Sequence, residues 1–157
     1  VEAVSLADRV LVLEEGRTAQ YAAPAEVARH PRSPWVARML GRNAWPGTVR
    51  DGRLALAAGG SLVSADPLPR AGTPAIAVVG PEAVSLHPER PSGSPRNVWP
   101  GTVREITAQG GRLRVLIAAE PEVVAEITPQ AAADLALAEG SPVWVSVKAT
   151  EITLVPL

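Results

Sequence analysis

The residues that could do chemistry in this chain are hydrogen-bond donors in its second half. Hydroxyl, guanidinium and ammonium groups stand at predicted turns and strand ends, on Ser94, Arg96, Thr128, Lys148 and Thr150. A tetrahedral oxyanion has acceptor oxygens and no donor, so a site for it needs such groups in fixed positions. Thr128 would also cap a helix, whose free N–H groups favour an anion. The set therefore indicates a small-anion site.

Other interpretations of the same residues stay open. Arg96 could pair with an acidic surface group, and Lys148, the only lysine among fifteen basic residues, could be a solvated strand end. Only the combination favours binding. We find no nucleophile, base and acid set in the sequence, and we expect His30 and His87 to be surface residues rather than metal ligands.

An internal repeat must position these donors. The hexapeptide Trp-Pro-Gly-Thr-Val-Arg occurs at Trp45–Arg50 and again at Trp99–Arg104, each time preceded by Arg-Asn and one small residue. Such identity within one short chain indicates two copies of one structural unit. Function should therefore lie in the unit and in the groove between the copies.

Each copy is expected to contain five short strands. In the first copy we predict strands at Thr48–Arg50, Arg53–Ala57, Ser61–Ser64, Ala75–Val79 and Val84–His87. In the second we predict strands at Thr102–Thr107, Arg112–Ala118, Val123–Ile127, Val143–Val147 and Ile152–Val155, with a helix between Thr128 and Gly140. This order is typical of a small OB-type barrel. We expect the copies to pack about a pseudo-twofold axis and to share one core.

The two copies differ where the donors stand. The alignment places Arg42 opposite Arg96, Gly80 opposite Lys148 and Glu82 opposite Thr150. The first copy thus lacks the lysine and carries a carboxylate that would repel an anion. We expect it to supply scaffold, with Arg42 as an additional candidate ligand.

Residues before the first copy have a different pattern. A helix end is expected at Ser5–Asp8, then a hairpin around Glu15-Gly16, a helix from Pro24 and another capped by Ser33. Trp35, Met39 and Leu40 are expected on the inner side of the last helix. The four tryptophans are expected to be core residues rather than a ligand cage; they are Trp35, Trp45, Trp99 and Trp144.

Composition excludes several classes of function. The chain has 157 residues, 46% of them hydrophobic, and a formal net charge of −1, so a nucleic-acid partner is not expected. Without cysteine it has neither disulfides nor thiolate metal sites, which fits a reducing compartment. We find no membrane-spanning apolar run and no signal peptide, and the missing initial Met suggests a fragment of a longer protein.

Residues 1–43 resemble the last part of an ATP-binding cassette (ABC) ATPase. The resemblance rests on Val1–Arg17, Ala23–Val27 and Pro31–Gly41. It implies a short α+β remnant that follows the switch histidine of such an ATPase. The phosphate loop, the signature loop and the acidic strand end for magnesium are not in this sequence. The chain itself is therefore not expected to be an enzyme, and ATP and magnesium would bind only to the intact parent.

Residues 44–157 resemble the transport-associated OB (TOBE) domain in its molybdate-binding Mop form. The resemblance rests on Ser94–Asn97, Ile127-Thr128 and Val147–Glu151. It implies a mainly β fold, with a degenerate first repeat at 44–90 and a second repeat at 91–157. The family places its oxyanion at an interface between units, and the matching residues here are Ser94, Arg96, Asn97, Thr128, Lys148 and Thr150. Ala131 and Pro95 depart from the pattern, and each removes one donor.

The resemblance implies the regulatory part of a molybdate or tungstate importer ATPase, with no cofactor of its own. Its partners would be a second ATPase subunit, the transmembrane permease and a small oxyanion. It would lie in the cytoplasm, at the inner face of the membrane. The alternative is a purely structural dimerisation module of an importer for another substrate, which binds no ligand.

Overall fold

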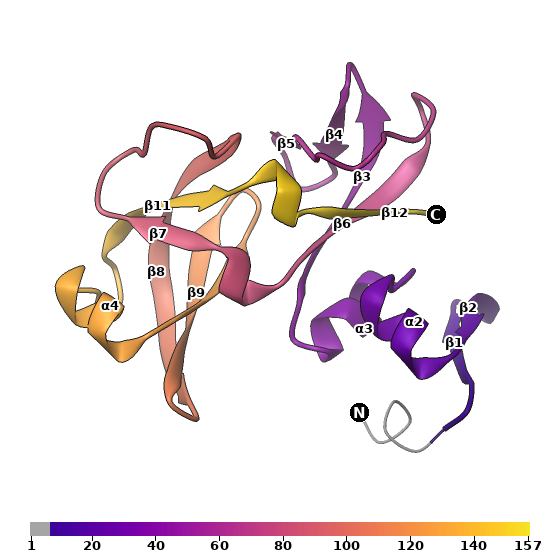
Figure 1. Ribbon diagram of the computed structural model, residues 1–157, viewed down its shortest axis with the longest axis horizontal. Helices are drawn as coiled ribbons and strands as arrows, with labels where there is room; N and C mark the ends of the chain where they lie inside the picture. The colour runs from indigo at the N-terminus through magenta and orange to yellow at the C-terminus, as the bar shows by residue number, and fades with distance from the viewer. Residues whose placement is uncertain (1–6) are drawn as a thin grey trace.

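The computed structural model describes residues 7–157, so the helix end expected at Ser5–Asp8 lies mostly outside them. The chain begins with a hairpin followed by two short helices (Figure 1). These elements are β1 (Val10–Glu14), β2 (Arg17–Ala22), α2 (Pro24–Arg29) and α3 (Pro34–Met39). Ser33 caps α3, as predicted, because its hydroxyl accepts a hydrogen bond from the Val36 amide at 3.3 Å.

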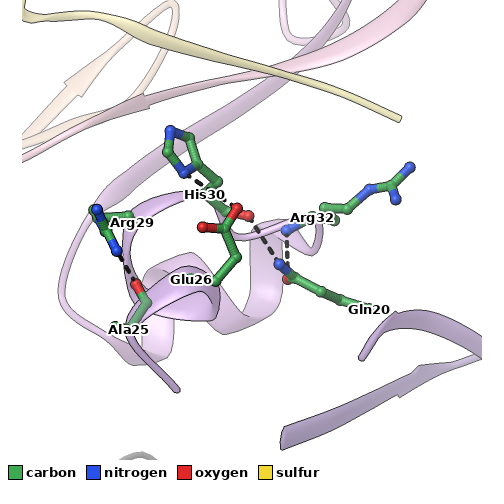
Figure 2. A network of polar contacts seen from close by, with 6 residues as sticks. All are labelled: Gln20, Ala25, Glu26, Arg29, His30 and Arg32. Carbon is green, nitrogen blue, oxygen red and sulfur yellow. Dashed lines mark hydrogen bonds and ion pairs between the residues drawn. The ribbon is translucent and has the colours of Figure 1, made fainter. Parts of the chain in front are cut away.

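A buried glutamine ties the hairpin to the helices. Gln20 on β2 donates to the carbonyl of His30 and accepts from the amide of Arg32, each at 3.0 Å (Figure 2). Both ends of its amide are therefore satisfied by the loop between α2 and α3. His30 lies outside this core, where it forms an exposed i,i+4 pair with Glu26 at 3.4 Å.

The inner face expected for α3 is wrong for Trp35 and Met39, and only Leu40 packs against a buried cluster. Trp35 is 65% exposed and Met39 is 44% exposed, whereas Val36 and Ala37 are buried. The helix has only six residues, so its packing face is too short for periodicity to define. Leu11, Leu13 and Tyr21 are also exposed.

The rest of the chain forms two five-stranded sheets. The first copy contributes β3 (Asn43–Arg50), β4 (Arg53–Leu56), β5 (Ser61–Leu62), β6 (Pro74–Val79) and β7 (Ser85–His87). The second contributes β8 (Asn97–Gln109), β9 (Arg112–Ala119), β10 (Val123–Ile127), β11 (Pro142–Val147) and β12 (Thr153–Pro156). Each copy thus has the five strands that its pattern predicts, and the mainly β, OB-like fold is confirmed.

The two copies exchange their last strands. One sheet has the order β10-β9-β8-β11-β7 and the other the order β12-β6-β3-β4-β5. Thus β7 of the first copy completes the sheet of the second, and β12 of the second completes the sheet of the first. In Figure 1 the yellow β12 lies beside β6, and the pink β7 lies beside β11.

Both sheets share one hydrophobic core, as predicted. Its largest cluster contains buried residues from both copies, among them Val79, Val103 and Ile117. The repeated tryptophans Trp45 and Trp99 meet edge to face, with ring centroids 5.8 Å apart. Both indole N–H groups donate to one segment, to the carbonyls of Glu122 and Pro121 respectively. These two tryptophans are core residues, whereas Trp144 is only half-buried.

The repeated strands start earlier than predicted, because each includes the proline of the hexapeptide. Pro46 pairs with Ile76, and Pro100 pairs with Trp144. A proline is tolerated where a strand lacks a ladder partner on one side. Here β4 pairs with β3 only from Gly47 onward, and beyond that ladder the carbonyl of Pro46 accepts from the Ala57 amide at 3.0 Å, a bond that needs no N–H on the proline.

The repeated glycine allows close contact between neighbouring strands. A Cβ on Gly101 would lie 2.5 Å from Ile117 Cγ2 and 3.0 Å from the carbonyl oxygen of Ala118. Gly47 faces Leu54 and Ala55 in the same way. This steric restriction explains why both copies of the hexapeptide contain glycine.

Replacing Gly101 by alanine should lower the free energy of unfolding by about 1–3 kcal/mol, the range for overpacking a core. Gly111→Ala is the matched control, because a Cβ there meets nothing within 4 Å. Urea denaturation of both variants measures the difference. Equal stability of the two variants would contradict the packing argument.

The helix of the second copy is shorter than predicted. Thr128 caps it, and its hydroxyl accepts from the Ala131 amide at 3.1 Å. However, α4 spans only Pro129–Asp134 and does not reach Gly140, because Ala136 adopts a positive φ of 50°. Among residues 7–157 no helix has the length and apolar character needed to span a membrane.

Candidate anion-binding site

Strand pairing brings Arg96 and Lys148 to neighbouring strand ends. In the β8–β11 ladder Asn97 is opposite Val147. Arg96 comes directly before Asn97 and Lys148 directly after Val147, so the two cations stand just beyond this end of the ladder. Both side chains are exposed, and neither has a carboxylate partner within 4.0 Å in the described part of the chain. Two adjacent positive charges without a counterion are the electrostatic arrangement that an anion would stabilise.

Thr150 belongs to a short 3-10 turn, Ala149–Glu151, which follows Lys148. This turn packs on the first copy, because the carbonyl of Ala149 accepts from the Ala65 amide at 2.9 Å. Asp66 lies next in the chain, and its carboxylate accepts from the Leu154 amide at 3.0 Å. The hydroxyls of Thr150 and Ser94 are exposed. One side of the predicted donor group is therefore closed by the first copy, and the other faces solvent.

Asn97 differs from the other predicted ligands, because its amide is already used. It is 4% exposed and donates to the carbonyls of Val63 and Val147, at 2.9 and 3.2 Å. Its oxygen accepts from the Val63 amide at 2.7 Å. In this structure Asn97 is thus a clamp that holds the two copies together. Its repeat counterpart Asn43 clamps both backbone groups of Val124 in the same way, at 2.9 Å.

The structure does not bring Thr128 to Lys148, as a single site would require. Thr128 follows β10, which contacts the first copy's 3-10 turn, Pro81–Ala83. In Figure 1 α4 lies at one end of the second sheet, far from the yellow turn between β11 and β12. The reason is the pseudo-symmetry of the two copies, which places the end of each third strand against the other copy's turn.

The corresponding position of the first copy is acidic. Arg42 and Gly80 stand at the strand ends there, since Asn43 is opposite Val79. A hollow of about 290 Å³ beside them is lined by the carboxylates of Glu82 and Glu126, together with Arg42 and Arg114. The Cδ of Glu82 lies 2.6 Å from the place of a Cβ on Gly80, so a lysine could not stand there unless Glu82 moved. Arg42 therefore lacks the lysine neighbour that Arg96 has.

One arginine near this hollow has a perturbed pKa. Arg112 is hydrogen-bonded to Glu126 at 2.8 Å, and this bond, with the attraction of the same carboxylate, raises the pKa of Arg112 above its ordinary value. Glu126 is thus already paired. The side chain of Arg112 points away from the core, and the pair lies on the surface of the second sheet.

Two arginines that sequence reasoning did not single out, Arg53 and Arg90, share a cleft of about 470 Å³ with Arg96 and Asn97. Arg90 lies in the linker between the copies, with its guanidinium 5.1 Å from the centre of the Trp144 ring. Such a cation–π contact holds the linker on the second sheet. Arg53 is the first residue of β4, as Arg112 is the first residue of β9 in the second copy.

The histidines form no metal site in the described residues, where no group of three potential ligands gathers. His87 is half-buried rather than on the surface, which corrects the expectation. Its Nε2 lies 2.7 Å from the hydroxyl of buried Ser146, so the exchanged β7 is hydrogen-bonded to β11 through side chains as well.

The fold consists of two small OB-like units that exchange their last strands, and Arg96 and Lys148 stand together at one strand end. Residues 93–154 match the model of the TOBE domain, and this part of the chain is a TOBE domain.

The relatives that match most of this chain are ATP-binding subunits of importers. The chain is 42% identical, over 99% of its length, to the molybdenum import ATP-binding protein ModC of Mycobacterium tuberculosis. It is 40% identical, over 83% of its length, to the sulfate/thiosulfate import ATP-binding protein CysA of Xanthomonas campestris. It spans 44% of the first relative and 36% of the second. The chain is thus similar to part of the ATP-binding subunits of these importers.

A solved structure is similar in fold. It is the cytoplasmic molybdate-binding protein ModG with molybdate bound, with a TM-score of 0.65 and 27% sequence identity. The match covers 73% of this chain and 96% of that one. The tandem arrangement of the present chain therefore has a counterpart in a protein solved with an oxyanion.

Proposed function

We propose that the tandem TOBE unit binds molybdate or tungstate and regulates the ATPase to which it belongs. The observation that carries the proposal is that Arg96 and Lys148 stand at neighbouring strand ends. Neither residue has an acidic partner in residues 7–157. Two cationic donors beside the hydroxyls of Ser94 and Thr150 suit a doubly charged tetrahedral anion. The names of the relatives ModC and ModG support the choice of molybdate.

The parent protein would be an ATP-hydrolysing importer subunit, with residues 1–43 as the end of its ATPase domain. Residues 44–90 would form the degenerate repeat and residues 91–157 the binding repeat. The subunit would work as a homodimer on a transmembrane permease, at the cytoplasmic face of the membrane. Bound anion would bias the ATPase toward a resting state, because it has different affinities for the two states of the dimer.

A homodimer would also complete the site. The donors Lys148, Thr150, Ser94 and Arg96 are exposed, and α4, which Thr128 caps, lies elsewhere in the same chain (Figure 1). A second subunit could offer a capped helix end like that of Thr128 to this open side. The ligand would then bridge two subunits, which is a direct way for an anion to alter their arrangement.

The test is a calorimetric titration of the chain with sodium molybdate, with sodium sulfate as the competitor. We expect saturable binding of molybdate, together with a ligand-dependent rise in the unfolding temperature. The alternative, a structural dimerisation module, predicts dimers in solution and no ligand-dependent shift. No saturable binding at any protein concentration would favour that alternative.

A further inference from the structure

A second cationic cleft lies where the N-terminal helices meet the sheets. It has a volume of about 690 Å³, within the usual range for small-molecule sites. Three parts of the chain form it: α3 through Arg38, the start of β3 through Arg42, and the second sheet through Arg114 and Val124. We call it the junction cleft. The residues Ser94, Arg96, Lys148 and Thr150 do not line it.

The junction cleft carries positive charge that the chain does not neutralise. Arg38, Arg42 and Arg114 have no carboxylate within 4.0 Å in residues 7–157. The one acidic residue of the lining, Glu122, is paired with Arg104 at 3.0 Å. Three guanidinium groups that line one hollow repel each other. A bound anion would offset this repulsion, because each guanidinium attracts it.

Two of the three guanidinium groups are held in place by the backbone. Arg38 Nη2 donates to the carbonyl of Ala44, and Arg114 Nη2 donates to the carbonyl of Gly41, each at 3.3 Å. Both carbonyls belong to the short segment that enters β3. A guanidinium has five N–H donors, so each of these side chains keeps further donors for a ligand while its position is fixed.

Arg42 differs from the other two arginines, because one of its nitrogens is buried without a partner in residues 7–157. Its Nε is the one buried side-chain nitrogen or oxygen in the described residues that has no hydrogen-bond partner. Leaving a buried donor unpaired costs free energy, and a bound ion or water molecule is one explanation for such a donor. Because this nitrogen is shielded from solvent, an anion in the junction cleft would reach it only after a movement of the Arg42 side chain, which lines the cleft.

The other hollow beside Arg42 does not suit an anion. It is smaller, about 290 Å³, and the carboxylates of Glu82 and Glu126 line it. Arg42 and Arg114 line both hollows, but Arg38 lines only the junction cleft, whose one acidic residue is paired with Arg104. The junction cleft thus has three arginines and one acidic residue, against two of each in its neighbour.

We propose that the junction cleft binds a phosphate- or sulfate-type oxyanion group, either free or carried by a nucleotide. Such a ligand would link α3 to the second sheet, because Arg38 and Arg114 belong to those two parts. It would therefore fix the end of the ATPase-like segment against the TOBE unit. The inference is independent of the molybdate site around Arg96 and Lys148, since neither residue lines the cleft.

The experiment uses the Arg96→Ala/Lys148→Ala chain, in which the molybdate site is removed. It is titrated at constant ionic strength with sodium phosphate, sodium sulfate and ADP, and binding is followed by calorimetry and by tryptophan fluorescence, because Trp45 borders the cleft. We expect saturable binding of at least one of the three. Adding Arg114→Gln to this chain should weaken the anion binding at least tenfold. Arg38→Gln should weaken it to the same extent, and because Arg38 is exposed, this variant should fold normally.

Arg50→Gln is the matched control, because it makes the same charge change at an exposed hairpin position that does not line the cleft. It should leave binding unchanged. Tighter binding of ADP than of phosphate would assign a nucleotide, and equal binding would assign the free anion. No saturable binding, or equal loss in the Arg50 and Arg114 variants, would overturn the proposal and leave the molybdate site unaffected.

Discussion

Replacing Arg96 and Lys148 together by alanine should weaken molybdate binding at least 100-fold. Each cation contributes a charge-assisted hydrogen bond, worth about 1.5–3 kcal/mol, so the loss of two corresponds to about 3–6 kcal/mol of binding free energy. Arg96 and Lys148 flank the last residue pair of the β8–β11 ladder, Asn97 and Val147, so their backbones stand at the same end of the two strands. Calorimetric titration of the double variant measures the loss.

The control for this variant must remove the same charge without touching the site. Arg50→Ala together with Arg70→Ala does so, since both residues are exposed and belong to the first copy. We expect its affinity to stay within about twofold of the unchanged chain, given the weak effect of screened surface charges. If both double variants bind molybdate as the unchanged chain does, the site has been assigned to the wrong residues.

The second large effect concerns stability rather than binding. Asn97→Ala should lower the free energy of unfolding by about 3–5 kcal/mol, because it removes three hydrogen bonds and leaves the half-buried backbone groups of Val63 and the buried carbonyl of Val147 without this partner. Urea denaturation followed by circular dichroism gives the value. Since Asn97 holds the first copy to the second, its loss should weaken the interface between them.

Asn43→Ala provides the comparison for this prediction. Its amide makes two hydrogen bonds, both to Val124, so we expect a loss of about 2–4 kcal/mol. The ratio of the two losses tests whether the clamps act as a pseudo-symmetric pair. A change below about 1 kcal/mol in the Asn97 variant would mean that water replaces the clamp.

The repeat and the hairpin signals are enough to predict the strands and their order. Val123–Ile127 is predicted with the bounds that the structure has, because alternation and a capping threonine delimit it. The exchange of β7 and β12 could not be predicted. The apolar pattern of a last strand is the same whichever fourth strand it pairs with, so only the three-dimensional structure distinguishes the two arrangements.

The arrangement of the two copies also separates two of the candidate ligands. Thr128 and Lys148 both belong to the second copy, but the elements that carry them contact the first copy at different places. The pairing of Arg96 with Lys148 was predictable, since it follows from the register of neighbouring strands. The role of Asn97 was not, because an amide in a motif can bind a ligand or clamp a backbone, and its sequence position is the same in both cases.

Arg38 and Arg114 show what the sequence does not contain. They lie 76 positions apart, as the difference of their numbers gives, and no motif links them. Their convergence on Gly41 and Ala44 depends on how α3 docks against the second sheet. Exposed arginines are common, so only the unpaired nitrogen of Arg42 and the lack of carboxylates close to the three guanidinium groups in residues 7–157 make this group informative.

The central claim is tested most directly by diffraction from crystals grown with molybdate, measured at the molybdenum absorption edge. We expect an anomalous peak within hydrogen-bond distance of both the Arg96 guanidinium and the Lys148 ammonium group, with the Ser94 or Thr150 hydroxyl beside it. If the saturated crystals show no peak there, with both side chains directed into solvent, the oxyanion-sensing account is contradicted and the TOBE unit is a scaffold.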